Sequence, residues 1–274
     1  MLRKRNLKNC NLNLNDIVTK VSGFKGAVHV ISVSDKQLWD YNRTSTLQFP
    51  TSAIKLHIAL ALDKAIQQGS ISVDTALQIT DYFAAEIYSA GSTISVGQAL
   101  DVMLSKSSNV TTNLIVDKLG GKSEATKLFK SIGSYSSTNF VNYLSLKADD
   151  SNSEENTSTA SEVSQAMYQL LTSSSSIAKR AVSAMKTNKD NFGLNSLLNK
   201  DAGNDKVVGN VGVFEQNGKQ YIITVFYYGS GSATQEVSPE KYVSPNDHYV
   251  IDVTKAILRN LEDCKGSTSN NNPK

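Results

Sequence analysis

The stretch FPTSAIKLHIALALDKAIQQG, residues 49–69, carries the most information about the fold. After Pro50 it has the composition of a helix that is apolar on nearly every face, which is typical of a buried helix. Yet this helix opens with Ser52 and carries Lys55 three residues later. Side chains three positions apart are neighbours on a helix. The sequence therefore places a hydroxyl beside an amine at the start of a buried helix.

This pair of side chains suggests nucleophilic chemistry. A serine hydroxyl attacks poorly until a neighbouring base takes its proton. Lysine can be that base where a dry, positively charged setting lowers its pKa. The N–H groups at a helix N-terminus also point outward, toward a developing oxyanion. A simpler interpretation stays open, in which Ser52 caps the helix and Lys55 is exposed, because S-x-x-K is common by chance.

Length and charge exclude some classes of function. A chain of 274 residues can form one large domain or two interleaved ones, with an ample core. Its 28 basic and 25 acidic side chains give a formal charge of +3, too mild and dispersed to indicate nucleic-acid binding. No run approaches the roughly 18 unbroken apolar residues of a transmembrane span. The basic start lacks the apolar stretch of a signal peptide, so an export signal is either not used or lies outside this sequence.

Cysteine and histidine give no sign of a metal centre. The two cysteines, Cys10 and Cys264, stand near opposite ends of the chain, and whether they pair is left open. The three histidines, His29, His57 and His248, are scattered, which does not fit the spacing of metal ligands. We therefore expect no metal and no cofactor.

Strands are expected near both ends of the chain and helices in the middle. Two β-rich runs surround a turn at residues 34–36, and a second hairpin is joined at Asn217 and Gly218, a pair suited to a type I′ turn. The polar, serine-rich residues 143–159 are expected to form a loop. Helices are expected over residues 12–22, 52–68, 96–104, 110–119, 123–131, 160–171, 177–186 and 246–261.

This order of elements predicts an α/β (α+β) fold. The simplest packing is one antiparallel sheet built from both chain ends, flanked by terminal helices, with an inserted all-helical lobe. Residues 12–50 and 196–264 would together form the sheet lobe, residues 51–195 the helical lobe, and residues 265–274 a disordered tail. A cleft between two lobes is a usual place for an active site.

A second stretch, MLSKSSNVTTNLIVDKLGG at residues 103–121, sets a polar triplet before an apolar helix. One interpretation is a polar turn in which Ser108 or Asn109 caps the helix. Another is a loop whose hydroxyl shuttles protons and whose amide holds a substrate carbonyl.

With these two motifs the chain resembles the class A serine β-lactamases and related penicillin-recognising acyltransferases, which carry S-x-x-K, S-D-N and K-T-G in this order. The stretches TSTASEVSQAM, from Thr157, and NVGVFEQNGKQYIITVF, from Asn210, are similar to the family's segment after the omega loop and its sheet hairpin. The resemblance spans roughly residues 16–261 and implies the fold of β-lactamases and transpeptidases.

The resemblance also implies roles for individual residues. Ser52 would attack the strained β-lactam carbonyl, with its own N–H in the oxyanion hole, while Lys55 accepts its proton directly or through water. Ser107 would relay the proton to the leaving nitrogen, and Asn109 would bind the substrate's side-chain amide. The aspartate of S-D-N is replaced here by Ser108, which is tolerable for a structural hydrogen-bonding position.

The third motif departs further from the family. Counting back from the hairpin places its lysine at Lys200, a substrate-binding position, with Asp201 and Ala202 in place of threonine and glycine. An aspartate there would repel a substrate carboxylate. A shifted alignment that uses Gly203 or Lys206 stays open, because this region looks loop-like, and Lys200 as a plain surface lysine stays open too.

The deacylating glutamate of the family's E-x-x-L-N motif is not evident. The corresponding residues, 143–147, match only at Leu146. Without a general base the water that attacks the acyl-enzyme loses about 100- to 10,000-fold in rate. Four acids follow in the same loop and would either substitute or form a solvated surface; they are Asp149, Asp150, Glu154 and Glu155.

Three functions are consistent with these residues. The first is a serine β-lactamase-like hydrolase with weak deacylation, the second a penicillin-binding D-alanyl-D-alanine peptidase-like acyltransferase, and the third a non-catalytic binding protein on the same fold. A Ser-His-Asp triad would require His29 or His248 in the cleft. From the family we expect a monomer that binds a small β-lactam or cell-wall peptide outside the cytoplasm, on or beyond the bacterial cell membrane, with no nucleic-acid partner.

Overall fold

The computed structural model describes residues 12–42, 47–48, 50–144, 155–188, 198–203, 207–229, 235–238, 241–243 and 246–263. The strands at 47–48, 198–203, 235–238 and 241–243 are described by their backbone alone. Several residues discussed above lie outside the described residues: Cys10, Leu146, Asp149, Asp150, Glu154, Lys206, Cys264 and the tail from 265 to 274.

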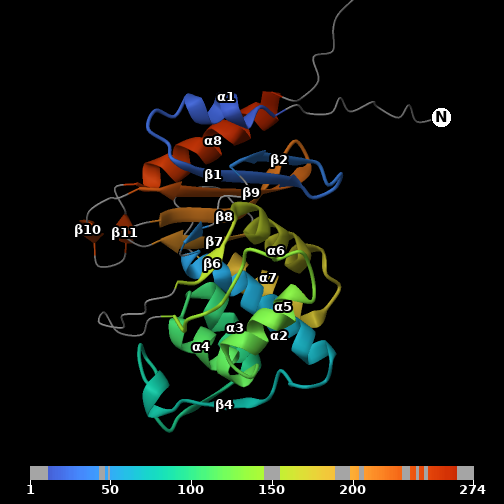
Figure 1. The fold of residues 1–274 in the computed structure, drawn as a ribbon, viewed down its shortest axis with the longest axis vertical. Helices are drawn as coiled ribbons and strands as arrows, with labels where there is room; N and C mark the ends of the chain where they lie inside the picture. The colour runs from blue at the N-terminus through green and yellow to red at the C-terminus, as the bar shows by residue number, and fades with distance from the viewer. Residues whose placement is uncertain are drawn as a thin grey trace, which may run out of the picture.

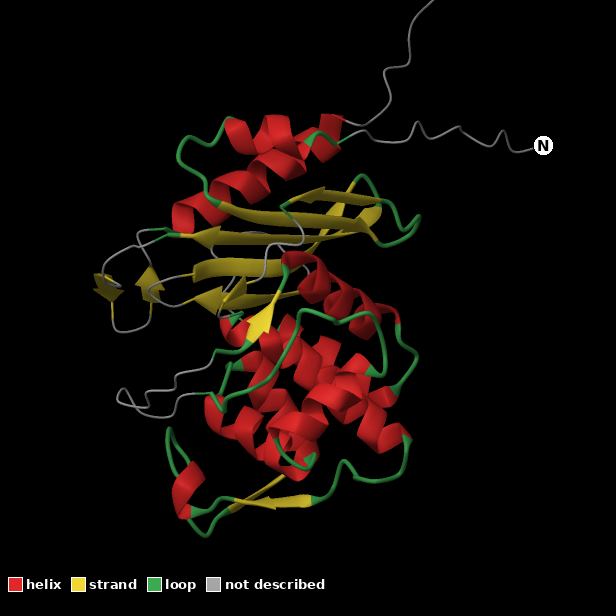
Figure 2. Cartoon of the chain, in the orientation of Figure 1, coloured by secondary structure: helices red, strands yellow, loops and turns green. Residues whose placement is uncertain are grey.

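The described residues form the following helices and strands (Figures 1 and 2). The helices are α1 (Leu14–Thr19), α2 (Lys55–Gln67), α3 (Val96–Ser105), α4 (Asn109–Lys118), α5 (Lys122–Lys130), α6 (Ala160–Thr172), α7 (Ser176–Lys186) and α8 (Asp247–Asp263), with two 3₁₀ turns, η1 (Thr51–Ile54) and η2 (Asp81–Phe83). The strands are β1 (Gly26–Ser32), β2 (Leu38–Tyr41), β3 (Leu47–Gln48), β4 (Ala76–Gln78), β5 (Thr93–Ser95), β6 (Thr157–Ser158), β7 (Leu198–Gly203), β8 (Val207–Gln216), β9 (Lys219–Tyr228), β10 (Gln235–Ser238) and β11 (Lys241–Val243).

The main sheet has five strands in the order β2-β1-β9-β8-β7, and every neighbouring pair is antiparallel. Strand β1 pairs with β9, so Gly26 lies opposite Tyr227 although most of the chain separates them. The sheet thus combines both ends of the chain, which confirms the predicted fold class. The exact lobe boundaries, at residues 50/51 and 195/196, stay a prediction.

The hairpin between β8 and β9 is closed by Asn217 and Gly218, with φ of 58° and 72°. Left-handed backbone at both positions is what a type I′ turn requires, so the predicted turn is confirmed. The Asn217 amide also donates to the carbonyl oxygen of Leu261 at 2.9 Å, which fastens the turn to α8.

Two separate hydrophobic clusters lie on the two faces of this sheet, because alternate strand residues point to opposite faces. Val28, Val30 and Val225 face α1 and α8. Ala27, Ile31 and other neighbouring side chains face the helical group that begins with α6. Figure 1 shows α1 and α8 stacked over one face of the sheet and the remaining helices gathered beyond the other.

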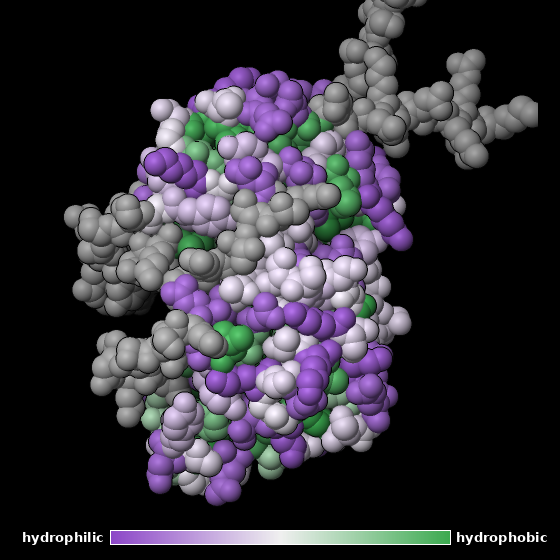
Figure 3. Space-filling view, in the orientation of Figure 1, coloured by the Kyte–Doolittle hydropathy of each residue, from purple (hydrophilic) through white to green (hydrophobic). Residues whose placement is uncertain are grey.

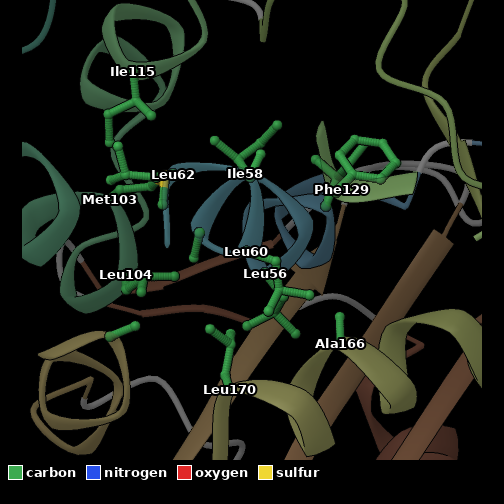
Figure 4. Packing of buried hydrophobic residues seen from close by; sticks show 14 of the residues in the cluster. Leu56, Ile58, Leu60, Leu62, Met103, Leu104, Ile115, Phe129, Ala166 and Leu170 are labelled. Atoms are coloured by element: carbon green, nitrogen blue, oxygen red, sulfur yellow. The ribbon is translucent and has the colours of Figure 1, made fainter. Parts of the chain in front are cut away.

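Helix α2 runs through the centre of this helical group. Its residues from Lys55 to Asp63 are all buried, as its uniformly apolar sequence predicts. Figure 4 shows Ile58 beside Phe129 of α5, and Leu62 beside Met103 of α3. A helix enclosed on this many sides has its N-terminal turn held rigidly in place.

Some local predictions were wrong. The first turn of the predicted helix at 52–68 is the 3₁₀ turn η1. The N-terminal helix begins after its Asn13 cap and ends at Thr19, so it is shorter than the predicted 12–22. The loop-like region around Lys200 is strand β7, at the edge of the sheet beside η1. The outer face seen in Figure 3 is largely hydrophilic, with hydrophobic areas separated by polar side chains.

Candidate active site

Ser52 and Lys55 meet at the entrance to α2. A 3₁₀ turn has three residues per turn, so its side chains at i and i+3 eclipse one another. Ser52 is the second residue of η1 and Lys55 the first of α2, and Lys55 Nζ lies 3.0 Å from Ser52 Oγ. Lys55 is fully buried, which rules out the interpretation of an exposed surface lysine.

The polar triplet after α3 brings a second hydroxyl and an amide to the same point. Ser107 Oγ donates to Ser52 Oγ at 2.8 Å and accepts from Lys55 Nζ at 3.0 Å. Lys55 Nζ also lies 2.6 Å from the Ser107 carbonyl oxygen and 2.8 Å from Asn109 Oδ1. Ser52, Lys55, Ser107 and Asn109 therefore form one cluster, from segments more than fifty positions apart.

Lys55 Nζ thus faces four oxygen atoms: Ser52 Oγ, Asn109 Oδ1 and the Oγ and carbonyl oxygen of Ser107. An ammonium group has three protons, so it cannot bond all four at once. Ser52, Lys55 and Ser107 are thus within hydrogen-bond distance of one another.

The backbone is left-handed on both sides of this cluster. Thr51, just before Ser52, has φ of 47°, and Ser107 has φ of 57°. Such values are uncommon for residues other than glycine, and they are outliers for β-branched threonine. Strain of this kind persists only where the surrounding structure imposes it, and it gathers at functional sites.

Sequence reasoning missed one residue that contacts this segment. Ser108 caps α4, as one interpretation proposed, and its hydroxyl accepts from the N–H of Thr111 at 3.2 Å. The same hydroxyl donates to Glu86 at 2.6 Å, and the other oxygen of Glu86 accepts from the N–H of Asn109 at 2.9 Å. Glu86 belongs to the irregular segment between η2 and β5, where no motif or periodicity marked it.

The position expected to carry a deacylating glutamate holds Tyr143. Its hydroxyl lies 3.4 Å from Asp117 Oδ1 and its ring packs on Phe83 and Tyr82. Burial, together with the negative charge of Asp117, raises the pKa of Tyr143. The phenol therefore stays protonated near neutral pH and is not a general base there.

The strand that would supply the third motif runs beside the nucleophile. Strand β7 packs against η1, and within it Lys200 lies opposite Val211 and Asp201 opposite Asn210 of β8. The backbone of the K-D-A triplet is thus at the sheet edge next to Ser52. The side-chain position of Lys200 is outside the described structure.

The histidines occupy other parts of the fold. His57 is buried and packs edge-on against Tyr135 and Phe129, with ring centroids 4.9 and 5.5 Å away. His29 is in β1, and His248 packs on Tyr249 in α8. Within the described ranges no three His, Cys, Asp or Glu side chains form a group that could hold a metal ion. No membrane-crossing helix is found in the described part of the chain.

The sequence also matches a known protein family. The chain matches the model of the Beta-lactamase enzyme family over residues 11–246. This protein therefore belongs to the β-lactamase enzyme family.

Solved structures show the same fold. PBP-A superposes with a TM-score of 0.76 at 19% identity, covering 91% of this chain and 96% of that one. A β-lactamase from Sphaerobacter thermophilus DSM 20745 has a TM-score of 0.75 at 16% identity, covering 90% and 96%. A variant of the extended-spectrum β-lactamase TLA-1 has a TM-score of 0.77 at 15% identity, covering 90% and 97%. At these identities the likeness concerns the fold alone. No curated protein sequence matches this chain.

Proposed function

We propose that this protein is a serine β-lactamase-like hydrolase that forms an acyl-enzyme on Ser52 and releases its product slowly. The observation that carries the proposal is the triangle of Ser52 Oγ, Lys55 Nζ and Ser107 Oγ, whose sides are 3.0, 3.0 and 2.8 Å. A nucleophile, a base and a proton relay within hydrogen-bond distance are the minimal parts of serine acyl transfer.

The acylation step follows from these contacts. Ser52 Oγ attacks the lactam carbonyl carbon while Lys55, as a neutral amine, takes its proton. The lactam C–N bond then breaks, and the nitrogen keeps the electron pair and receives a proton through the Ser107 hydroxyl. Full burial of Lys55 at the start of α2 keeps bulk water away from this proton transfer.

Substrate binding is assigned to groups around this triangle. The N–H of Ser52 is in the first turn of η1, where N–H groups lack acceptors within the helix, and it would stabilise the developing oxyanion. Asn109 would hold the amide of the substrate's side chain. Lys200, whose backbone is on the adjacent edge strand, would attract the substrate carboxylate.

Deacylation is expected to be slow, because Tyr143 replaces the family's glutamate and its hydroxyl contacts Asp117. This observation also favours a second candidate, a penicillin-binding peptidase-like acyltransferase, which needs the same acylation residues and no such glutamate. A variant of PBP-A, which shares 18% identity with this chain, has been solved as an acyl-enzyme complex with penicillin G. Penicillin G is therefore a suitable first probe. Action outside the cytoplasm stays a prediction from the family.

Intact-mass spectrometry of the protein mixed with penicillin G tests the proposal. We expect a mass increase equal to one penicillin, absent in Ser52→Ala and retained in Ser131→Ala, a control at the exposed serine that caps the C-terminus of α5. Decay of the adduct with accumulation of penicilloate identifies a hydrolase, whereas a permanent adduct identifies the acyltransferase. If no adduct forms with penicillins, cephalosporins or carbapenems, the hydrolase and the acyltransferase are both contradicted. A binding protein on this fold then remains.

A further inference from the structure

The carboxylate of Glu86 bonds three successive residues at the start of α4. Ser108 Oγ donates to Glu86 Oε2 at 2.6 Å, and the N–H groups of Asn109 and Val110 donate to Oε1 at 2.9 and 3.3 Å. A negative charge at a helix N-terminus is stabilised by the helix dipole, and bonds to a charged acceptor are stronger than neutral ones.

These three residues adjoin the atoms that contact the nucleophile and its base. Asn109 donates its N–H to Glu86 and presents its Oδ1 to Lys55 Nζ. Ser107, immediately before them, contacts both Lys55 and Ser52 while its backbone is held in the left-handed region at φ 57°. Glu86 bonds the backbone and cap of this segment, whereas Lys55 bonds the oxygen atoms of Ser107 and Asn109.

The replaced residue of the second motif fits this arrangement. The resembling family has an aspartate where this chain has Ser108. Here Ser108 supplies only a hydroxyl, which donates to Glu86 and accepts from Thr111 N–H. The negative charge at the start of α4 therefore comes from a residue 22 positions earlier in the chain.

We propose that Glu86 is a positioning residue that holds Ser107 and Asn109 against Lys55, in place of the aspartate that Ser108 replaces. It acts through the backbone and the cap of α4. The inference deepens the proposed function and rests on it only for the acylation measurement described below.

The first test is independent of activity. In Glu86→Ala we expect amide hydrogen exchange at Asn109 and Val110 to accelerate about tenfold or more, while the cores of α2 and α6 exchange as before. Glu124→Ala is the matched control, because Glu124 is an exposed helix acid whose ion pair with Lys127 is on the surface of α5. Unchanged exchange at Asn109 and Val110 overturns the proposal. Accelerated exchange across the whole molecule overturns it too, because Glu86 would then stabilise only the fold.

The second test moves the carboxylate. Glu86→Ala should slow acylation of Ser52 by penicillin G about tenfold or more, in the chemical step rather than in drug binding, because small displacements of catalytic groups are costly. Adding Ser108→Asp to Glu86→Ala restores a carboxylate at the cap of α4 and should recover most of the rate. Ser108→Asp alone sets two carboxylates side by side and should lower the rate.

The effect of Ser108→Asp on the acylation rate should therefore have opposite signs with and without Glu86. This difference separates a positioning role of Glu86 from a general effect on stability. If Ser108→Asp has the same effect with and without Glu86, the proposal is overturned. If the unmodified protein forms no penicillin adduct, the proposed function fails, and the exchange measurement still decides the role of Glu86.

Discussion

The side-chain amide of Asn113 bonds both the N–H and the carbonyl oxygen of Leu144, at 2.8 Å each. These two hydrogen bonds fix the backbone after Tyr143 to the middle of α4. The first residues of this helix contact Lys55. This contact uses only the backbone of Leu144, so a replacement of the Tyr143 side chain leaves it in place.

Tyr143→Glu is expected to speed deacylation. A carboxylate at this position supplies a general base for the attacking water, an effect typically worth about 100- to 10,000-fold. We expect the half-life of the penicillin adduct to shorten at least about tenfold, measured by intact mass after removal of free drug. Tyr143→Gln is the control of equal size without a base. Equal half-lives for the two variants would show that a further group is missing.

Lys55→Met is expected to slow acylation by about 100-fold or more, because it removes the proton acceptor beside Ser52 and keeps a long apolar stem in the buried site. Lys64→Met, on the same helix and near its C-terminal end, serves as the control. Adduct formation is followed by mass, with thermal unfolding recorded for both variants. An unchanged rate in Lys55→Met would assign the base elsewhere.

His57 should make the fold sensitive to acid. Burial lowers the pKa of His57 to about 3, whereas an unfolded histidine titrates at about 6.5. Between these two pH values the histidine is protonated in the unfolded state and neutral in the folded state. The contribution of His57 to the free energy of unfolding is therefore fully present above pH 6.5 and is lost as the pH falls toward 3. From pH 6.5 to pH 5 the loss is about 2 kcal/mol, at 1.36 kcal/mol per unit.

The measurement is denaturant unfolding at pH 7 and pH 5. His57→Gln should lose about 2 kcal/mol less than the unmodified protein between the two pH values, whatever its stability at pH 7. Other titrating groups are shared by the two proteins and cancel in the comparison. Parallel losses would mean that His57 takes up its proton in the folded state.

Gly26→Ala should strongly destabilise the sheet. A Cβ on Gly26 would overlap the backbone carbonyl oxygen of Phe226, which cannot turn aside as a side chain does. We expect a cost of about 3 kcal/mol, the upper end for overpacking. Gly91→Ala is the control, because a Cβ there meets nothing within 4 Å and only its φ of 83° is unfavourable. If chemical denaturation gives the same loss of unfolding free energy for both variants, the overlap with Phe226 is not the cause.

The elements predicted from sequence are those with a distinctive composition or pattern. Helix α2 was visible as a long apolar run, α3 and α6 by an apolar face, and β8 and β9 as two β-rich runs around Asn217. Strand β7, with the sequence LNKDAG, has neither an apolar run nor an alternating pattern. It is an edge strand paired with β8 alone, so backbone hydrogen bonds define it and its side chains need not alternate.

The residues of the candidate site also differ in whether the sequence could predict them. Ser52, Lys55, Ser107 and Asn109 could be placed because each belongs to a motif of fixed spacing. Glu86 could not, because it reaches α4 across the fold from a segment without regular structure. Its role depends on a contact between distant segments, and no local pattern records such a contact.

The pairing of β1 with β9 has a consequence for how this protein is made. On a ribosome β1 emerges early, but its partner β9 follows only after the whole helical group, a delay on the order of ten seconds or more at about 5–20 residues per second. The helices between them can pack through local contacts during that time. Until residues 219–228 appear, the edge of β1 that will pair with β9 has no partner strand, and it is open to chaperones or to another growing chain. The last third of translation therefore decides whether the helical group acquires the sheet beside its candidate active site.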